Sequence, residues 1–444
     1  MATAMPHART ISEREAVTEE TWLLDLRWEE VSRLDLDAIV VRYPRIVTIA
    51  PHPGDEVLSV GATLADIAGR GTEVTVIVAT HGDDGLGAAV RRVDGDRAIS
   101  ALSPTIRTVW WDLPYGRLAD VNGELRRLLS AEADTGTLLL APVESDGSTD
   151  HDAVARAAEE AALERGAALL QYPVPLWHWA QPDDADWRRL RTLAPPLRAL
   201  ERKSDAAEHL GNQLGSAALA RARRVVEVVL APNDSDLAGR VADIAAPRTD
   251  VSEPFDAMFS EGRDDPWHFD DSVYETRRHD LVMACLGRQR YSRVIDIGCA
   301  TGQLAARLAA RADAVTGIDA SAPALAVAAA RTPDVRWLRG TVPADLPRET
   351  FDLIVLSEVT YFLDGPDLLS TLRRVRQALA PDGEIVLANW RRPTDDIPLD
   401  GPTTHRQAAA VLDLPVRARY EDADLLIEVW GHPLSVYDDG KGES

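Results

Sequence analysis

Three side chains of the kinds that bind metal ions follow predicted strands in the first half of the chain. His52 and Asp55 lie in Pro51-His-Pro-Gly-Asp-Glu56, directly after the predicted strand Arg45–Ala50, and His151 follows a later predicted strand. Zinc accepts imidazole nitrogen and carboxylate oxygen as ligands, and a catalytic zinc site keeps one coordination position for water. The three residues are therefore candidate zinc ligands, although most histidines in proteins bind no metal.

A second group of residues, in the other half, has the spacing of a nucleoside-binding site. The apolar strand that begins at Arg293 runs into a turn of small residues that contains Gly298 and ends at Gly302. Glycines let the backbone of such a turn pass close to a ligand. Asp319 lies 17 residues after Gly302, at the end of the next predicted strand, where a carboxylate can accept hydrogen bonds from ribose hydroxyls. The order of the glycines differs from G-x-G-x-x-G, which disfavours a dinucleotide.

Both groups depend on strands that alternate with helices. In the first half the predicted strands are Arg45–Ala50, Glu73–Thr80, Arg107–Leu113, Thr137–Val143 and Leu169–Val174. In the second half they are Arg293–Cys299, Ala314–Asp319, Val335–Arg339, Phe351–Val359 and Glu384–Trp390, followed by a hairpin pattern over Val416–Tyr420 and Leu425–Trp430. Helical patterns separate most of these strands, which is typical of βαβ units. We therefore expect an α/β protein with two Rossmann-like three-layer domains, each with a mostly parallel sheet flanked by helices.

The length of 444 residues also indicates two domains, because single hydrophobic cores stop growing at about 250–300 residues. The region from Ala231 to Trp267 is rich in Pro, Asp, Ser and Gly and has little periodicity, which is typical of a linker. A short helix at Thr21–Leu34 is expected to pack onto the first domain. The predicted borders are an N-terminal extension over 1–42, a first domain over 43–245, a linker over 246–270 and a second domain over 271–444.

The composition excludes several classes of function. The formal net charge is −24, from 48 basic and 72 acidic residues, and no block of Lys or Arg offsets it. We therefore expect neither nucleic acid nor a membrane surface as a partner. Cys285 and Cys299 are too few for a disulfide framework or a thiolate zinc site. No apolar run approaches the ~20 residues that span a bilayer, and residues 1–20 contain no apolar signal core, so we expect a cytoplasmic protein, with its oligomeric state left open.

The second half resembles the class I S-adenosylmethionine-dependent methyltransferases over about residues 270–432. The resemblance rests on Asp296-Ile-Gly-Cys-Ala-Thr-Gly302, on Asp319 and on the strands around them. It implies S-adenosylmethionine as the cofactor, with its methionine part surrounded by Asp296, Gly298, Ala300 and Gly302 and its ribose bound by Asp319. Such enzymes often place an acid against the adenine amine, whereas this chain has Gly340-Thr341. The hydroxyl of Thr341 is a candidate acceptor for that bond.

A narrower resemblance links this half to the nodulation-type N-methyltransferases. It rests on Asp265-Pro-Trp-His-Phe269, Tyr274-Glu-Thr-Arg-Arg278, Ser357-Glu-Val-Thr-Tyr-Phe-Leu363 and Asn389-Trp-Arg-Arg392, with Gly401 and His405. Those enzymes methylate the free amine of a de-N-acetylated glucosamine in a chitooligosaccharide, and orientation carries most of such a displacement. A nearby carboxylate would receive the amine proton. Glu358 is the first candidate for this role and His405 the second, while Trp267 and Tyr274 are candidates for a lid or a sugar-stacking wall.

The first half resembles the PIG-L family of zinc-dependent N-acetylglucosaminyl deacetylases over about residues 43–215. The matching motifs are Pro51-His-Pro-Gly-Asp-Glu56, Leu113-Pro-Tyr-Gly-Arg-Leu118, Asp146-Gly-Ser-Thr-Asp-His151 and Tyr172-Pro-Val-Pro-Leu-Trp-His-Trp179. By this resemblance, the three zinc ligands are His52, Asp55 and His151. Gly54 replaces the aspartate that acts as general base, a loss of about 10²–10⁴ in rate. Ser148 replaces a histidine that stabilises the oxyanion, a loss of about 10²–10³. Candidates to replace the base are Glu56, Asp83 and Asp146.

Two hypotheses about function follow. In the first, one domain removes an acetyl group from an amino sugar or glycoconjugate and the other methylates the freed amine, because an acetylated nitrogen cannot attack a sulfonium. In the second, a working methyltransferase is joined to a zinc-binding but catalytically impaired domain that binds sugar or acts as a scaffold. The three retained ligands favour the first hypothesis, whereas Gly54 and Ser148 favour the second.

Overall fold

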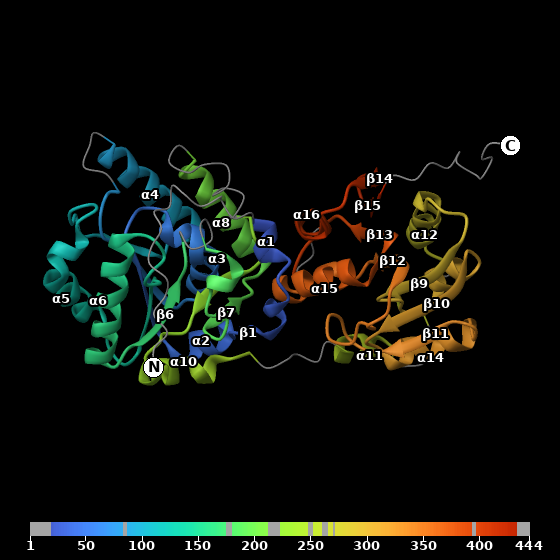
Figure 1. Cartoon of the computed structure of the whole chain (residues 1–444), viewed down its shortest axis with the longest axis horizontal. Helices are drawn as coiled ribbons and strands as arrows, with labels where there is room; N and C mark the ends of the chain where they lie inside the picture. The colour runs from blue at the N-terminus through green and yellow to red at the C-terminus, as the bar shows by residue number, and fades with distance from the viewer. Residues whose placement is uncertain are drawn as a thin grey trace. The chain divides into compact units, whose positions relative to one another are not determined.

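The computed structural model describes residues 19–82, 87–174, 180–211, 223–246, 252–259, 265–269, 271–392 and 397–432 (Figure 1). The chain divides into two compact units, Met1–Pro247 and Arg248–Ser444. Each unit is built on one mostly parallel sheet with helices packed against it, which confirms the predicted fold class. None of the helices among these residues combines the length and the hydropathy that a bilayer crossing requires.

The described residues of the first unit form an eight-stranded sheet with the order β1-β7-β8-β6-β5-β2-β3-β4. Its strands are β1 (Ser32–Arg33), β2 (Arg45–Ala50), β3 (Glu73–Val78), β4 (Arg107–Trp110), β5 (Thr137–Pro142), β6 (Ala168–Tyr172), β7 (Leu190–Leu193) and β8 (Glu227–Leu230). The strands β6, β5, β2, β3 and β4 run parallel to one another. Only β8 pairs antiparallel with its neighbours β6 and β7 in this described sheet.

Helices cover both faces of this sheet, which explains the continuous apolar runs of its central strands. The named helices are α1 (Glu19–Leu23), α2 (Leu36–Arg42), α3 (Asp55–Gly69), α4 (Ala88–Leu102), α5 (Asn122–Glu132), α6 (Thr149–Arg165), α8 (Leu197–His209) and α10 (Ser235–Val241). Val47 of β2 and Leu139 of β5 are fully buried in one cluster with Leu125 of α5 and Val154 of α6. The core therefore fixes the ends of β2 and β5, where the candidate metal ligands begin.

The predicted helix over Thr21–Leu34 is wrong. The structure has the short α1, a 3-10 turn over Leu26–Glu30 and then β1, which pairs in parallel with β7. Asp25 separates the two helical turns, because its side chain accepts a hydrogen bond from the backbone N–H of Arg27 and so starts a new turn. This segment, predicted as an extension that packs onto the first domain, also supplies an edge strand of its sheet.

The described residues of the second unit form a seven-stranded sheet with the order β11-β10-β9-β12-β13-β15-β14. Its strands are β9 (Tyr291–Ile297), β10 (Ala312–Asp319), β11 (Arg336–Arg339), β12 (Phe351–Ser357), β13 (Leu379–Trp390), β14 (Val416–Glu421) and β15 (Leu425–Trp430). The first five in the sheet order are parallel, and the predicted hairpin β14–β15 completes the sheet with antiparallel pairs. The direction of strand addition reverses between β9 and β12, so a ligand is expected at the carboxyl ends of these strands.

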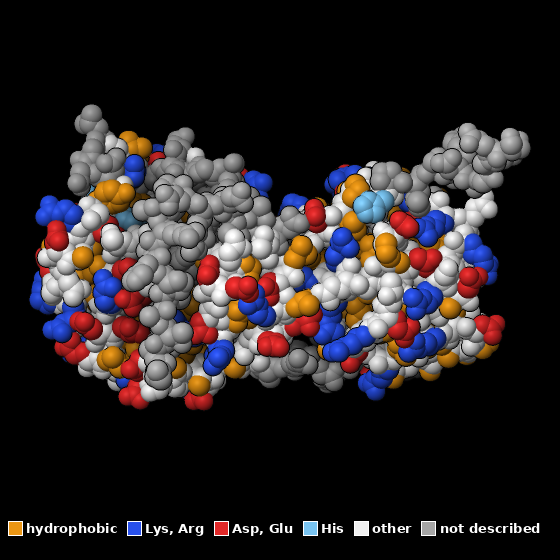
Figure 2. Space-filling view, viewed as in Figure 1, with side chains coloured by type: hydrophobic (Ala, Val, Ile, Leu, Met, Phe, Trp, Pro, Cys, Tyr) orange, Lys and Arg blue, Asp and Glu red, His pale blue; other side chains and the backbone are white. Residues whose placement is uncertain are grey.

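The helices of this unit include one inside the predicted linker. They are α11 (Ser252–Met258), α12 (Val273–Cys285), α13 (Gln303–Ala309), α14 (Ala322–Arg331), α15 (Gly365–Ala378) and α16 (Gly401–Leu412). The predicted linker over 246–270 contains α11, which has seven residues and is too short to produce a visible helical periodicity. Figure 2 shows basic and acidic side chains interspersed on the face of each unit that it draws.

Candidate metal centre and cofactor pocket

The structure brings the three predicted metal ligands together at the carboxyl end of the first sheet. His52 follows β2, Asp55 is the first residue of α3, and His151 is the third residue of α6, which follows β5. Because β2 and β5 are adjacent and parallel, their carboxyl ends lie at the same edge. One ligand atom from each of the three residues lies within 4.8 Å of the other two.

Buried carboxylates hold both histidine rings in place. Nδ1 of His52 and Nε2 of His151 lie 3.5 and 3.2 Å from the same oxygen of Asp55. The second nitrogen of each ring contacts another carboxylate: Nε2 of His52 lies 3.1 Å from Asp150, and Nδ1 of His151 lies 2.8 Å from Asp146. Carboxylates that hold the outer nitrogen of a ligating histidine fix its orientation and make it a better ligand. These orienting roles of Asp146 and Asp150 were not predicted from the sequence.

The electrostatics of the cluster suit a divalent cation. Burial opposes protonation of His52, but hydrogen bonds to Asp150 and Asp55 outweigh it and raise its pKa to about 9. Burial also opposes protonation of His151, yet the charges of Asp55 and Asp146 raise its pKa to about 10. A surplus of carboxylates therefore draws positive charge to this point. Two imidazoles and a carboxylate are a normal donor set for zinc, so the residues present fit that ion.

Asp150 also holds the loop that follows β4 in place through hydrogen bonds to its backbone. Its two carboxylate oxygens accept hydrogen bonds from the backbone N–H groups of Gly116 and Leu118 at 2.7 and 3.0 Å. The ring of Tyr115, on the same loop, meets the ring of His52 edge-on, with their centroids 5.2 Å apart. One buried carboxylate thus joins a metal ligand to the segment beside it.

The residue that replaces the expected general base has a backbone suited to glycine. Gly54 precedes α3 with φ = +100°, and a Cβ built on it would lie 3.0 Å from the side chain of Leu210. Ser148, at the other substituted position, caps α6 by accepting a hydrogen bond from the N–H of His151 at 3.4 Å. Both positions therefore have local structural roles, but neither supplies an acid or a base.

The three candidates to replace the base differ in their surroundings. Glu56 is fully buried, accepts a hydrogen bond from the N–H of Gly54 at 3.1 Å, and has its pKa raised to about 8 by burial. Asp146 is fully buried against His151, so its role is orientation of that ring. Asp83 lies outside the described residues.

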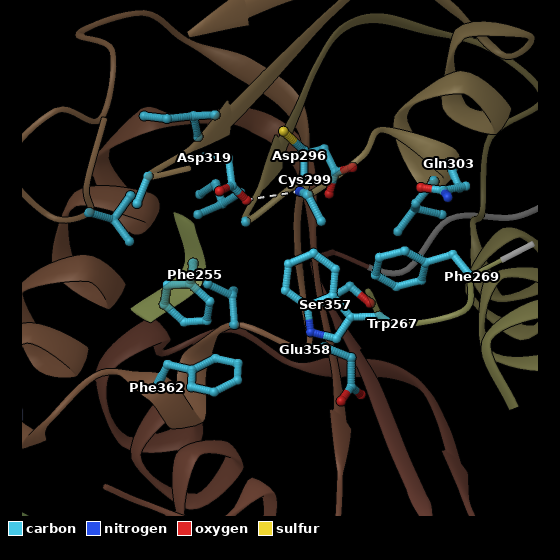
Figure 3. Close-up of a pocket in the computed structure, with 18 of the residues that line it drawn as sticks. Phe255, Trp267, Phe269, Asp296, Cys299, Gln303, Asp319, Ser357, Glu358 and Phe362 are labelled. Atoms are coloured by element: carbon cyan, nitrogen blue, oxygen red, sulfur yellow. Dashed lines mark hydrogen bonds between the residues drawn. The ribbon is translucent and has the colours of Figure 1, made fainter. Parts of the chain in front are cut away.

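A pocket of about 230 Å³ lies at the switch point of the second sheet (Figure 3). The predicted residues that line it are Asp296, Gly298, Ala300, Asp319, Thr341 and Glu358. The turn between β9 and α13 has positive φ angles at Gly298, Ala300 and Gly302, and Ala300 is not a glycine. Gly302 is not among the lining residues, and a Cβ built on it would lie 2.6 Å from the ring of Trp337.

Two carboxylates face this pocket in different ways. Asp319, at the end of β10, accepts hydrogen bonds from the backbone N–H groups of Ala300 and Ser321, each at 2.8 Å. Asp296 is 1% exposed, and neither of its oxygens makes a well-formed hydrogen bond within the described part of the chain; the backbone of Ala305 interacts with it only weakly. Burial raises the pKa of Asp296 to about 7. A buried carboxylate without a strong partner fits a ligand that brings a positive charge.

The predicted catalytic residues Glu358 and His405 lie in different places. Glu358 follows β12 with φ = +57° and lines the pocket, where its carboxylate points away from Asp296 and Asp319 (Figure 3). His405 is on α16, is buried, and has its Nδ1 2.9 Å from Glu428. It is not among the residues that line the pocket, and α16 packs mainly against α15 and against β13 and β15.

Aromatic side chains from the predicted linker wall the pocket. Phe255 of α11 meets Phe362 edge-on with centroids 5.2 Å apart, and Trp267 lies between Asp296 and Glu358 in Figure 3. Trp267 also contacts Phe269, at 5.5 Å between centroids. Three of the five phenylalanines of the chain lie between residues 255 and 269. This clustering is the feature of the sequence that could have indicated the aromatic wall. Thr341, which also lines the pocket, donates to Asp345 through its backbone N–H at 2.8 Å.

Comparisons with known proteins divide the chain in the same way. Residues 47–162 match the family model PIG-L, described as GlcNAc-PI de-N-acetylase, and residues 260–397 match that of nodulation protein S, NodS. Nodulation protein S of Azorhizobium caulinodans is 30% identical over 131 residues, which are 29% of this chain and 63% of that protein. The corresponding protein of Sinorhizobium fredii is 30% identical over 139 residues, 29% of this chain and 64% of that protein.

Among solved structures, the N-methyltransferase NodS of Bradyrhizobium japonicum WM9, in complex with S-adenosyl-L-homocysteine, is 25% identical. The match covers 42% of this chain and 100% of that chain, with a TM-score of 0.38. The chain spans 56–64% of the length of the curated nodulation proteins it matches. The two family matches and the nodulation proteins indicate that the chain carries a PIG-L-like region over residues 47–162, followed by a region over residues 260–397 that is similar to the methyltransferase family of nodulation protein S.

Proposed function

We propose that the second unit transfers a methyl group from S-adenosylmethionine to the amine of an amino sugar or glycoconjugate. The observation that carries the proposal is the pair of acids in the pocket. Asp296 is buried without a strong partner and suits the ammonium of the methionine part, and Asp319 is held by two backbone N–H groups in position for ribose hydroxyls. The bound cofactor supplies a methyl group activated by a sulfonium.

The acceptor end of the pocket suits an amine. Glu358 lies away from the two acids assigned to the cofactor, and its carboxylate can receive the proton that an amine loses on methylation. The similarity of residues 260–397 to NodS supports an amino sugar as the acceptor class. The aromatic wall of Phe255, Trp267 and Phe362 offers flat surfaces of the kind on which sugar rings pack.

For the first unit we propose zinc-dependent removal of an N-acetyl group from the same class of sugar. His52, Asp55 and His151 would hold the ion, which would polarise an amide carbonyl and acidify a water molecule. Asp146 and Asp150 keep the two imidazoles aimed at the ion position. The order of reactions follows from chemistry, because the lone pair of an amide nitrogen is delocalised and cannot displace a sulfonium.

A second candidate function for the first unit is zinc-dependent sugar binding without hydrolysis. It is favoured by Gly54, which has no side chain to accept a proton and whose neighbour Glu56 is buried against the backbone. The missing general base would cost about 10²–10⁴ in rate. Both candidates require the metal, so metal content alone does not separate them.

The test uses the full chain with two tetrasaccharides, chitotetraose and its analogue with one free amine at the non-reducing end. We expect S-adenosylmethionine to methylate the free-amine analogue alone, and chitotetraose to be methylated only after acetate is released. His52→Ala should remove the zinc, about one ion per chain, and abolish acetate release while leaving methylation of the free amine intact. Methylation without acetate release supports the second candidate. If the free amine is never methylated, the proposal for the second unit is wrong.

A further inference from the structure

The carboxylate of Glu358 is held by two tyrosines that come from different elements. The hydroxyl of Tyr274, the second residue of α12, donates a hydrogen bond to Oε1 at 3.1 Å. The hydroxyl of Tyr361, in the 3-10 turn over Thr360–Phe362 that follows β12, donates to Oε2. Each oxygen of the carboxylate therefore has one phenol donor and keeps a lone pair for another partner.

This arrangement holds the carboxylate in an unusual backbone position. Glu358 has φ = +57°, a left-handed backbone conformation that residues with a side chain rarely adopt and that is often found at functional sites. Its N–H donates to the carbonyl of Ala388 at 2.8 Å, which fixes the backbone. The rings of Tyr274 and Tyr361 are themselves packed edge-on or tilted against Trp390 and Phe362, with centroids 5.1 and 4.7 Å apart.

The charged and titratable groups around Glu358 come mainly from α12. Burial raises the pKa of Glu358, whereas the positive charge of Arg278 and the hydroxyls of Tyr361 and Tyr274 lower it, and Glu275 raises it again. Arg278 does not contact Glu358 directly but pairs with Glu275 and with Ser357. The two phenols are therefore the direct hydrogen-bond donors that favour the ionised carboxylate among the described residues.

We propose that Tyr274 and Tyr361 are positioning residues that hold Glu358 ionised as the receptor for the protonated amine of the acceptor, so that the pocket selects amines over alcohols. The inference rests on the proposed methyl transfer. A protonated amine is drawn to the carboxylate and loses one proton to it or to solvent. The nitrogen lone pair then forms the bond to the methyl carbon while the carbon–sulfur bond breaks, with its electron pair left on sulfur. Where Glu358 has taken the first proton, it releases that proton to solvent before it accepts one from the new ammonium.

An alcohol gains little from the same site. It carries no charge to attract to the carboxylate, and it is a weaker nucleophile until it is deprotonated by a base much stronger than a carboxylate. The proposed selectivity therefore comes from electrostatics at one point of the pocket. It depends on the ionised form of Glu358. The hydrogen bonds from the two phenols stabilise that form, whereas burial disfavours it.

The experiment compares Tyr361→Phe, Tyr274→Phe and the double variant with wild type, using the free-amine tetrasaccharide over a range of pH. Each substitution removes one donor to the carboxylate, so we expect the acid limb of kcat/KM to move to higher pH and the rate at neutral pH to fall about tenfold in the double variant. Above the shifted limb, the variants should recover to within about threefold of wild type. The affinity for S-adenosyl-L-homocysteine should stay within about twofold.

Tyr291→Phe is the matched control, because the hydroxyl of Tyr291 also donates to a buried glutamate, Glu384 at 2.8 Å, but lies outside the pocket lining. Its pH profile should match wild type. A purely structural role of Tyr274 and Tyr361 predicts an equal loss at every pH instead, and this result would overturn the proposal. Methylation of the fully acetylated tetrasaccharide on a hydroxyl would also overturn it.

A second readout needs no acceptor. The infrared band of a protonated carboxyl, identified as Glu358 by its loss in Glu358→Gln, should appear at higher pH in the two phenylalanine variants than in wild type. If the band appears at the same pH in the variants as in wild type, the inference is wrong, even if methyl transfer is observed. A shifted band with no methyl transfer to any amine supports the role of the tyrosines and instead contradicts the proposed function.

Discussion

Asp146, which is fully buried, accepts a hydrogen bond from Nδ1 of His151 at 2.8 Å. This contact leaves Nε2 of His151 directed at the carboxylate of Asp55, 3.2 Å away. Asp150 does the same for His52 through Nε2. The candidate metal centre thus consists of three ligands and two further carboxylates that orient its two histidines.

Removal of the carboxylate behind His151 should weaken metal binding without removing a ligand. We expect Asp146→Ala to lower the affinity for zinc about 10–100-fold, because the imidazole loses both its orientation and the partner that makes it basic. Competition with a fluorescent zinc chelator measures the change. The control is Asp152→Ala on α6, next to His151, where the carboxylate accepts a hydrogen bond from the N–H of Ser145. Equal affinities for the two variants contradict the assigned role.

A base restored at position 54 should speed acetate release. We expect Gly54→Asp to raise the rate by about 10²–10⁴, at a cost of about 1–2 kcal/mol in the free energy of unfolding, because φ is +100° there. The end of the flexible Leu210 side chain must also move slightly. Gly54→Asn has the same shape and strain but no base, and serves as the control. Wild-type acetate release as fast as that of Gly54→Asp would show that this chain has another base.

Loss of the acid at the end of β10 should weaken cofactor binding. We expect Asp319→Ala to raise the Kd for S-adenosyl-L-homocysteine at least tenfold, because the ribose hydroxyls lose their acceptor and the turn loses its bond to the N–H of Ala300. Isothermal titration calorimetry gives the value directly. Asp313→Ala, which removes an exposed partner of Arg290 outside the pocket, should leave the Kd unchanged. A Kd that is the same in both variants argues against the ribose assignment.

Cofactor binding should also depend on pH through Asp296. Burial raises the pKa of this carboxyl to about 7 in the free pocket, so it becomes protonated as the pH falls through 7. The ammonium of the ligand prefers the ionised form, so the Kd should rise by up to about tenfold per pH unit below pH 7. Above pH 7 it should level off. In Asp296→Asn we expect weaker binding that no longer changes between pH 5 and 7, and a slope that persists in this variant would assign the effect to another group.

The convergence of His52, Asp55 and His151 could be predicted because it depends only on the sheet. Each residue follows a strand that reads as a continuous apolar run, and neighbouring parallel strands end at the same edge. Asp296 and Asp319 line one pocket for the same reason, because β9 and β10 are adjacent and parallel. Contacts behind these residues could not be predicted, since the partners of Asp146 and Asp150 depend on where α6 begins and how the loop after β4 folds.

The remaining differences between the prediction and the structure arise from a short helix, an isolated histidine and a contact between residues far apart in the sequence. The seven-residue helix α11 is too short to show periodicity, so the aromatic wall of the pocket was hidden in an expected linker. His405 lies on a helix whose position over the sheet the sequence does not reveal, and the structure pairs it with Glu428 away from the pocket. Tyr361 is 3 positions from Glu358 in the sequence, whereas Tyr274 is 84 positions away. Only the fold brings Tyr274 into contact with Glu358, so this hydrogen bond could not be predicted.

The most direct test is calorimetric titration of the purified full chain with S-adenosyl-L-homocysteine at neutral pH. We predict one binding site per chain on the second unit, with an affinity that Asp319→Ala weakens at least tenfold. No measurable binding of this ligand or of S-adenosylmethionine by folded protein would contradict the central claim that the two acids at the end of β9 and β10 hold a sulfonium nucleoside beside an amine acceptor.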